Sequence, residues 1–243
     1  MTVILLGDSF IRRMKDELLP TGASHGIQLP GATDQRLLCG ATGGNCSDIT
    51  AHQTKDATQL AENMKISNHY HSIFVLTHGI SMIQDLQAPH CDDTVQQLQP
   101  DIVFLDIGTN DVANMTKVSP TSVLTLVTTL TDLAFSLPCS KALISAMLPR
   151  TGHMIAPTEV FQENQQLFNR MLYHICSTSD KLVFHWPRGF ETAHNFQDGV
   201  QVPRSRAVSD WSDDGVHCNA AALRQYIKRV RQAILQQAHH VLP

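Results

Sequence analysis

The sequence predicts an α/β fold, in which helices cover both faces of a parallel β-sheet. Short apolar runs bounded by polar or turn residues alternate along the chain with longer segments of helical periodicity, and this alternation is typical of strand–helix–strand units. The length of 243 residues and the hydrophobic content of 42% suit one α/β domain with a sizeable core. Because crossovers between parallel strands are right-handed, the carboxyl ends of the strands are expected at one edge, where ligands usually bind.

Five segments are predicted to be strands of this sheet, because each is a short apolar run that ends at polar or turn residues. The four clearest are residues 3–6, 73–77, 102–107 and 142–147, and a weaker fifth is residues 182–185. Helices are predicted between and after the strands, at residues 10–19, 81–86, 120–137, 157–176 and 219–237.

The last of these helices has a clear amphipathic pattern. Its apolar residues recur at helical spacing, at Leu223, Ile227, Val230 and Ile234, and Asn219 is suited to cap its amino end. The basic residues of the segment lie off this stripe. We interpret them as a solvated helix face, and a docking surface is the alternative interpretation.

The segment at about residues 20–70 does not fit the alternating pattern. It is rich in Gly, Thr, Asn, Gln and His and has no apolar period. We therefore predict a single domain over residues 1–243, with this segment as an insertion over or beside the edge that binds ligands. A lid, a partner surface and a simple loop are all compatible with its composition.

The overall charge argues against partners that need a basic protein. The formal net charge is -4 and the pI is about 6.3, so a nucleic-acid partner is not expected. No apolar stretch approaches the ~20 residues of a membrane span. The first predicted strand follows Met1 so closely that it leaves no room for a signal peptide, and a cytoplasmic location is expected. The cysteines are scattered, and we interpret them as reduced thiols.

Three polar motifs carry the chemistry of the chain. Ser9 follows the first predicted strand within Gly-Asp-Ser, Asn110 follows the third within Gly-Thr-Asn-Asp, and His217 ends an Asp-Gly-Val-His run before the last helix. A serine hydroxyl is a weak nucleophile unless an imidazole accepts its proton and a carboxylate orients that imidazole. Asp214, three residues before His217, suits the last task, and the Asn110 amide is suited to donate to an oxyanion.

Each motif also has a simpler explanation. Asp8 and Ser9 are common helix caps, Asn110 has the chemistry of a turn residue, and His217 is one of 13 histidines. Asp213 is an alternative orienting acid. The presence of all three motifs in this order favours the catalytic interpretation.

Together the motifs resemble the sequence blocks of the SGNH hydrolases, also called GDSL-like esterases and lipases. The resemblance implies a three-layer α/β/α, flavodoxin-like domain and an ester hydrolase that works through an acyl-serine intermediate. It implies Ser9 as the nucleophile, His217 as the base and Asp214 as the acid that orients this base. The backbone N–H of Ser9 and the Asn110 amide would belong to the oxyanion hole, and the resemblance implies no metal and no organic cofactor.

The glycine of the family's second block has two candidate positions in this chain. Gly43 or Gly44 lies at a suitable distance after Ser9, whereas Gly79 follows the second predicted strand. Because an N–H group of the oxyanion hole must come from the carboxyl end of a strand to reach the edge that carries Ser9, we favour Gly79. Ser81 is close to Gly79 in the sequence, but the resemblance assigns it no role.

The resemblance leaves the substrate open, since SGNH hydrolases cleave acetylated sugars, lipids, thioesters and small esters with the same site. We expect a small acyl or acetyl ester, because the lack of a secretion signal disfavours an extracellular polysaccharide. The alternative is a non-catalytic or mobile-element-associated esterase-like module that acts in binding or assembly. The basic last helix supports this alternative, and the complete set of site residues argues against it.

Overall fold

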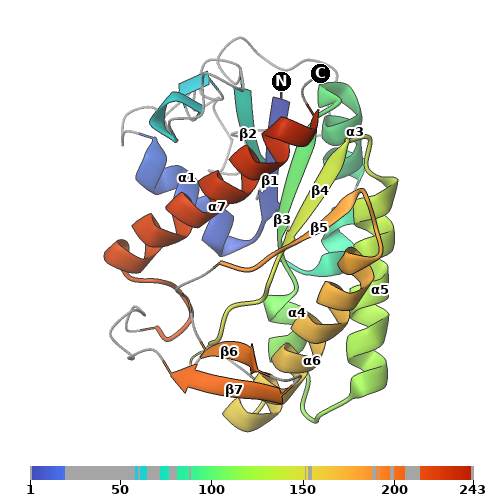
Figure 1. Cartoon of the computed structure of the whole chain (residues 1–243), viewed down its shortest axis with the longest axis vertical. Coiled ribbons are helices and arrows are strands. Elements are labelled where there is room, and N and C mark those ends of the chain that lie inside the picture. The colour runs from blue at the N-terminus through green and yellow to red at the C-terminus, as the bar shows by residue number, and fades with distance from the viewer. Residues whose placement is uncertain are drawn as a thin grey trace, which may run out of the picture.

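A computed structural model of the chain describes residues 2–19, 58–59, 61–64, 72–76, 81–87, 89–150, 152, 155–187, 190, 192–197, 200–205 and 214–241 (Figure 1). Most of the insertion predicted at about residues 20–70 lies outside the described residues, as do Gly43, Gly44 and Gly79. The choice among these three glycines for the oxyanion hole, and the insertion, therefore stay predictions.

The centre of the fold is a five-stranded sheet of order β2-β1-β3-β4-β5, in which every pairing is parallel. This is the strand order of flavodoxin-like folds. The strands are β1 (Thr2–Gly7), β2 (Ser72–Leu76), β3 (Ile102–Asp106), β4 (Lys141–Ser145) and β5 (Leu182–His185). The predicted α/β fold class, with its flavodoxin-like parallel sheet, is confirmed, and each strand lies within two residues of its predicted bounds.

Helices cover both faces of the sheet, which gives three layers (Figure 1). One face carries α1 (Ser9–Leu18) and α7 (Ala220–Val241). The other carries η2 (Ile83–Gln87), α3 (Pro89–Leu98), α4 (Thr109–Ala113), α5 (Pro120–Ser136) and α6 (Thr158–Ser177).

The side chains of β1 alternate between the two layers of helices. Val3 and Leu5 pack in the cluster that contains α1 and α7, whereas Ile4 and Leu6 pack in the cluster that contains α5 and α6. All four side chains are at most 1% exposed. Because both faces of a covered parallel sheet are buried, its strands are apolar on both sides, which explains the continuous apolar runs in the sequence.

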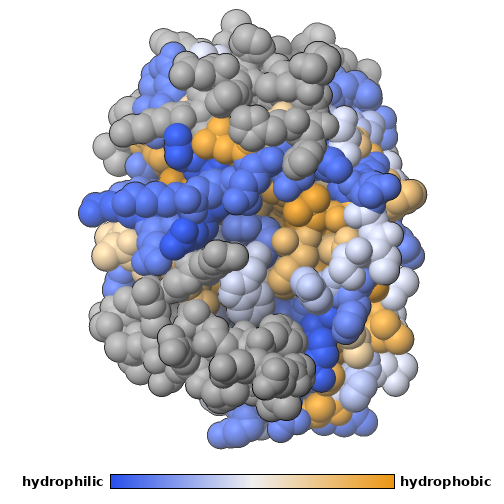
Figure 2. Space-filling view, viewed as in Figure 1, coloured by the Kyte–Doolittle hydropathy of each residue, from blue (hydrophilic) through white to orange (hydrophobic). Residues whose placement is uncertain are grey.

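The amphipathic pattern predicted for α7 is confirmed, because all four residues of its apolar stripe are buried. Oδ1 of Asn219 accepts the backbone N–H of Ala222 at 3.0 Å, as expected of a helix cap. The hydrophilic band across the front of the molecule follows the outer face of α7, which carries Arg224 and Lys228 (Figure 2). None of the described helices is both long and apolar enough to cross a membrane.

The structure departs from the sequence prediction in its smaller elements. The helix expected at residues 81–86 is the short 3-10 helix η2. Helices α3 and α4 were not predicted, because α3 is mostly polar in sequence and α4 has only 5 residues, too few to display a period. A hairpin of β6 (Thr192–Gln197) and β7 (Val200–Ser205) was also missed. It lies at the end of the molecule toward which the parallel strands run (Figure 1).

Candidate active site

Ser9 is the first residue of α1, directly beyond the carboxyl end of β1. The carboxylate of Asp8 caps this helix by accepting the N–H of Phe10 at 3.0 Å, so the cap does not occupy the hydroxyl of Ser9. A Cβ atom on Gly7 would lie 2.4 Å from the backbone oxygen of Asp106. Glycine at this position therefore allows β1 and β3 to approach closely where the site begins.

The structure brings Ser9, Asp214 and His217 together from the two ends of the chain. Oγ of Ser9 lies 2.7 Å from Nε2 of His217, and Nδ1 of His217 lies 2.7 Å from Oδ2 of Asp214. The other oxygen of Asp214 accepts the backbone N–H groups of Val216 and His217, each at 2.9 Å. The carboxylate is thus held by its own loop while it contacts the imidazole. Asp213, the alternative orienting acid, lies outside the described residues.

Two residues of α1 support the imidazole and the carboxylate. The ring of Phe10 lies against the ring of His217, with 5.7 Å between centroids. Nη2 of Arg13 lies 3.4 Å from Oδ2 of Asp214. The side chain of His217 is 15% exposed, so the imidazole remains partly accessible to a substrate.

Asn110 lies in α4, directly beyond the carboxyl end of β3. Gly108, the residue that caps the start of this helix, has a φ of 109°, which is in the left-handed region that favours glycine. Nδ2 of Asn110 donates to the backbone oxygen of Ser81 at 3.0 Å, and Nη1 of Arg150 donates to Oδ1 of Asn110 at 3.0 Å. An amide nitrogen carries two hydrogens, so the bond to Ser81 leaves one N–H of Asn110 for a ligand.

Ser81 contributes its backbone oxygen to the site, whereas its hydroxyl bonds to Asp85 at 3.1 Å. Asp85 also accepts the backbone N–H of Ser81, at 2.8 Å. Asp111, next to Asn110, accepts the backbone N–H of Ile83 at 3.1 Å, and burial raises the pKa of Asp111 to about 6. The bond from Ile83 to Asp111 ties η2 to α4, and the bonds to Asp85 hold Ser81, whose backbone oxygen accepts from the Asn110 amide.

Sequence reasoning missed Arg150 as a residue of this site. It follows β4 and is only 6% exposed. Burial lowers the pKa of its guanidinium, and the nearby carboxylates of Asp8 and Asp214 counter part of this effect. A charged residue shortly after a strand predicted to end at the catalytic edge was the available signal.

Below the site lies a buried pair of carboxyl groups, Asp8 and Asp106, each 7% exposed. The hydroxyl of Tyr226 donates to Oδ2 of Asp106. Burial, and then the charge of Asp8, raise the pKa of Asp106 to about 7, although the bond from Tyr226 opposes this rise. Burial also raises the pKa of Asp8. Asp106 thus binds its proton more tightly in the folded protein than an exposed aspartate does.

We expect Asp106 to make the protein less stable as the pH rises. In the unfolded chain this group loses its proton near its ordinary pKa of 3.8, but in the folded protein only near 7. The folded state therefore binds more protons between these values, and the free energy of unfolding falls until about pH 7. Such a pKa rise corresponds to a loss on the order of 4 kcal/mol.

The variant Asp106→Asn tests this expectation, because its amide oxygen still accepts from Tyr226 but carries no charge. The free energy of unfolding in urea should be measured for both proteins at pH 5 and pH 8. We expect Asp106→Asn to exceed the wild type by more at pH 8 than at pH 5. The exposed Asp132→Asn on α5 is the matched control. A gain that is the same at both pH values would contradict the role given to Asp106.

Comparisons with known proteins identify the family of the chain and its fold. Residues 5–225 match the GDSL-like Lipase/Acylhydrolase family. The chain belongs to this family. The predicted resemblance to the SGNH hydrolases is thereby confirmed. A comparison with curated protein sequences found no match.

Three solved structures share this fold over nearly the whole length of the chain. A putative acylhydrolase from Bacteroides fragilis has 15% identity and a TM-score of 0.56, over 98% of this chain and 88% of its own. A carbohydrate esterase family 3 protein from Talaromyces cellulolyticus has 16% identity and a TM-score of 0.53, with both chains fully covered. An acetyl esterase mutant with acetate ion has 15% identity and a TM-score of 0.53, again with full coverage of both chains.

The part of the chain that the structure describes contains no cluster of potential metal ligands. Among those residues, no three His, Cys, Asp or Glu side chains form a group that could hold an ion. Cys139, Cys176 and Cys218 form no disulfide.

Proposed function

We propose that this protein is a serine esterase that hydrolyses a small acyl or acetyl ester through an acyl-serine intermediate. The observation that carries the proposal is the distance of 2.7 Å between Oγ of Ser9 and Nε2 of His217. At this distance the imidazole can accept the hydroxyl proton directly. The contact of Asp214 with Nδ1 keeps the hydrogen of the neutral ring on that nitrogen and leaves Nε2 as the acceptor.

In the first half of the reaction, Oγ of Ser9 attacks the ester carbonyl carbon while His217 takes the hydroxyl proton. The carbonyl oxygen becomes an oxyanion. The remaining N–H of Asn110 and the backbone N–H of Ser9, at the positive end of α1, are the donors proposed for it, together with Gly79. When the tetrahedral intermediate collapses, the ester C–O bond breaks, and His217 gives its proton to the departing alcohol.

In the second half, water attacks the acyl-serine carbonyl and His217 accepts a proton from this water. Collapse of the second intermediate releases the acid and returns the proton to Oγ of Ser9. The negative charge of Asp214 stabilises the imidazolium form of His217 in both halves. Arg13, at 3.4 Å from the same carboxylate, adds a positive charge beside Asp214.

Hydrolysis of p-nitrophenyl acetate, butyrate and octanoate by the purified protein tests the proposal. We expect kcat/KM to be largest for acetate and smallest for octanoate, with the rate of Ser9→Ala as background. Two of the solved structures of this fold are described as acetyl or carbohydrate esterases, which supports starting from acetyl esters. A preference for octanoate would overturn the substrate class, whereas turnover equal to that of Ser9→Ala would overturn the esterase.

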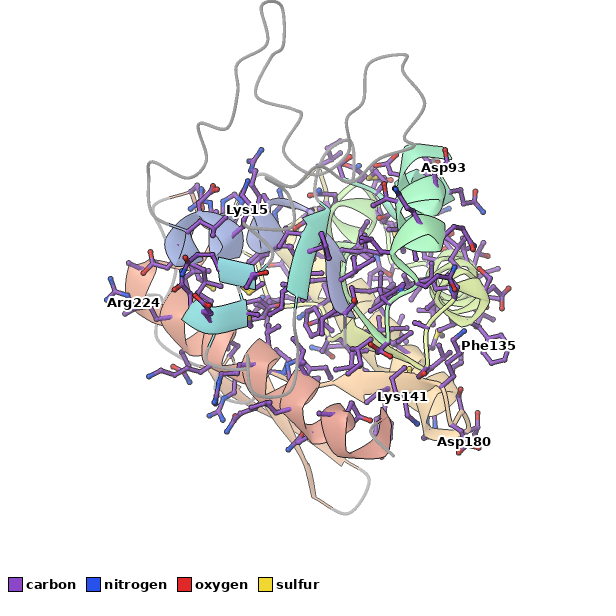
Figure 3. All side chains as sticks on the ribbon, turned by 90° about the horizontal axis from the view of Figure 1, so that it is seen from above. Lys15, Asp93, Phe135, Lys141, Asp180 and Arg224 are labelled. Atoms are coloured by element: carbon purple, nitrogen blue, oxygen red, sulfur yellow. The ribbon has the colours of Figure 1, made fainter. Side chains whose placement is uncertain are left out.

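The outer face of α7 favours a second candidate, a non-catalytic module that binds a polyanion such as nucleic acid. Arg224, Lys228, Arg229 and Arg231 line one hollow of about 620 Å³ on this helix. Arg224 lies at the periphery of the molecule (Figure 3), and its Nε lies 2.9 Å from Oε1 of Glu17. Nucleic-acid binding that weakens steeply with salt, in a protein without ester turnover, would favour this candidate over the esterase.

A further inference from the structure

We infer that Arg150 is a positioning residue that aims the Asn110 amide at the oxyanion and ties it to the loop of Asp214 and His217. The inference rests on the proposed esterase function, and it concerns a side chain outside the family's sequence motifs. Arg150 acts through two bonds: Nη1 donates to Oδ1 of Asn110 at 3.0 Å, and Nε donates to the backbone oxygen of Gly152 at 2.7 Å.

The partners of Asn110 permit only one orientation of its amide. A guanidinium can only donate hydrogen bonds, and the backbone oxygen of Ser81 can only accept them. If the amide turned over, its nitrogen would face the donor Arg150 and its oxygen would face the acceptor Ser81, so both bonds would be lost at once. Arg150 and Ser81 therefore keep the nitrogen, and its second hydrogen, on the side away from the guanidinium.

Gly152 carries the second half of the connection. Its N–H donates to the backbone oxygen of Gly215 at 3.0 Å, within the loop that holds Asp214 and His217. A Cβ atom on Gly152 would lie 1.9 Å from the backbone oxygen of Asp214. Arg150 and Gly152, which we call the Arg150/Gly152 bridge, thus connect the oxyanion side of the site to its acid–base side.

The segment that leads to the bridge is itself fixed by α6. Oδ1 of Asn169 accepts the N–H of Met147 at 2.8 Å, and the backbone oxygen of Met147 accepts from Gln165 at 2.8 Å and from Asn169 at 3.0 Å. Asn169 and Gln165 are both buried. The chain therefore leaves β4 in a defined direction, which a rigid positioning role requires.

The test compares Arg150→Met with Arg170→Met, which removes an exposed arginine of α6. We expect Arg150→Met to lower kcat on p-nitrophenyl acetate about 10- to 100-fold, since misplacement by about 1 Å costs rates of this order. KM should change by less than about threefold, because the amide acts mainly on the oxyanion. Arg170→Met should match the wild type.

A double-mutant cycle separates positioning from general structural support. In an Asn110→Ala background, Arg150→Met should lower kcat by much less than in the wild type, because its main target is gone. Gly152→Ala acts on the Asp214 loop instead, so its loss should persist in that background. An equal loss from Arg150→Met in both backgrounds, or a kcat like that of the wild type, would overturn the inference.

If Arg150→Met does not fold, kcat of Arg150→Lys tests the same inference. A lysine keeps the positive charge beside Asp8 and Asp214 but cannot bond to Asn110 and Gly152 with the fixed geometry of a guanidinium. We expect a folded protein with reduced kcat, and full activity would overturn the inference. Retained turnover in Ser9→Ala would instead reject the esterase and this role with it. An inactive Ser9→Ala beside an unimpaired Arg150 variant would reject the role of Arg150 alone.

Discussion

Replacing Ser9 by alanine is expected to lower kcat/KM for p-nitrophenyl acetate by at least about a thousandfold, because the variant lacks the atom that forms the acyl bond. The fold should be unaffected, since Asp8 rather than Ser9 caps α1. The imidazole of His217 and the donors of the oxyanion hole would remain, and they account for the residual rate that serine hydrolases show without their nucleophile.

Ser136→Ala is the matched control for this measurement. Ser136 is the last residue of α5, and its hydroxyl donates to the backbone oxygen of Leu133 at 2.8 Å. α5 ends at the opposite end of the molecule from α4 (Figure 1). We expect this variant to retain the activity of the wild type. If Ser9→Ala and Ser136→Ala hydrolysed the ester at equal rates, Ser9 would not be the nucleophile.

Replacing Asp214 by asparagine is expected to lower kcat about ten-thousandfold, although the two side chains have the same shape. In the wild type, one oxygen of Asp214 accepts two backbone N–H groups and the other faces Nδ1 of His217. The asparagine oxygen would keep the backbone bonds, so its amino group would face Nδ1. The ring would then accept at Nδ1 and carry its hydrogen on Nε2, where it cannot take the proton of Ser9.

Asp213→Asn is the matched control, because it is the same substitution one residue earlier and tests the alternative orienting acid. We expect kcat to stay near that of the wild type. NMR of ring nitrogens in the two variants would report the tautomer of His217 directly. A loss of activity in Asp213→Asn with normal rates in Asp214→Asn would transfer the orienting role to Asp213.

The main elements of the fold were predictable because burial on both faces leaves a plain trace in the sequence. The strands of the central sheet are continuous apolar runs, and α7 carries an apolar stripe at helical spacing. α3 left no such trace, since Val95 and Leu98 are the apolar residues of its second half. The β6–β7 hairpin lacks an apolar run, because it lies outside the main sheet.

The residues that contribute side chains to the site were easier to predict than those that contribute backbone groups. Ser9, Asn110 and His217 stand in short motifs after strands or before a helix, so their convergence followed from the topology. Ser81 enters through its backbone oxygen, which any residue type supplies, and no residue pattern marks such a group. Arg150 is the opposite case, since its charge was visible in the sequence but its bond to Asn110 depends on how the chain leaves β4.

The central claim is that Ser9 forms the acyl bond with the help of His217, and covalent labelling tests it most directly. A fluorophosphonate reacts with an activated serine, and tandem mass spectrometry locates the adduct on the peptide. We predict one adduct, on Ser9, which is absent in Ser9→Ala and much slower to form in His217→Gln. An adduct on another residue, or labelling of Ser9→Ala at the rate of the wild type, would contradict the account.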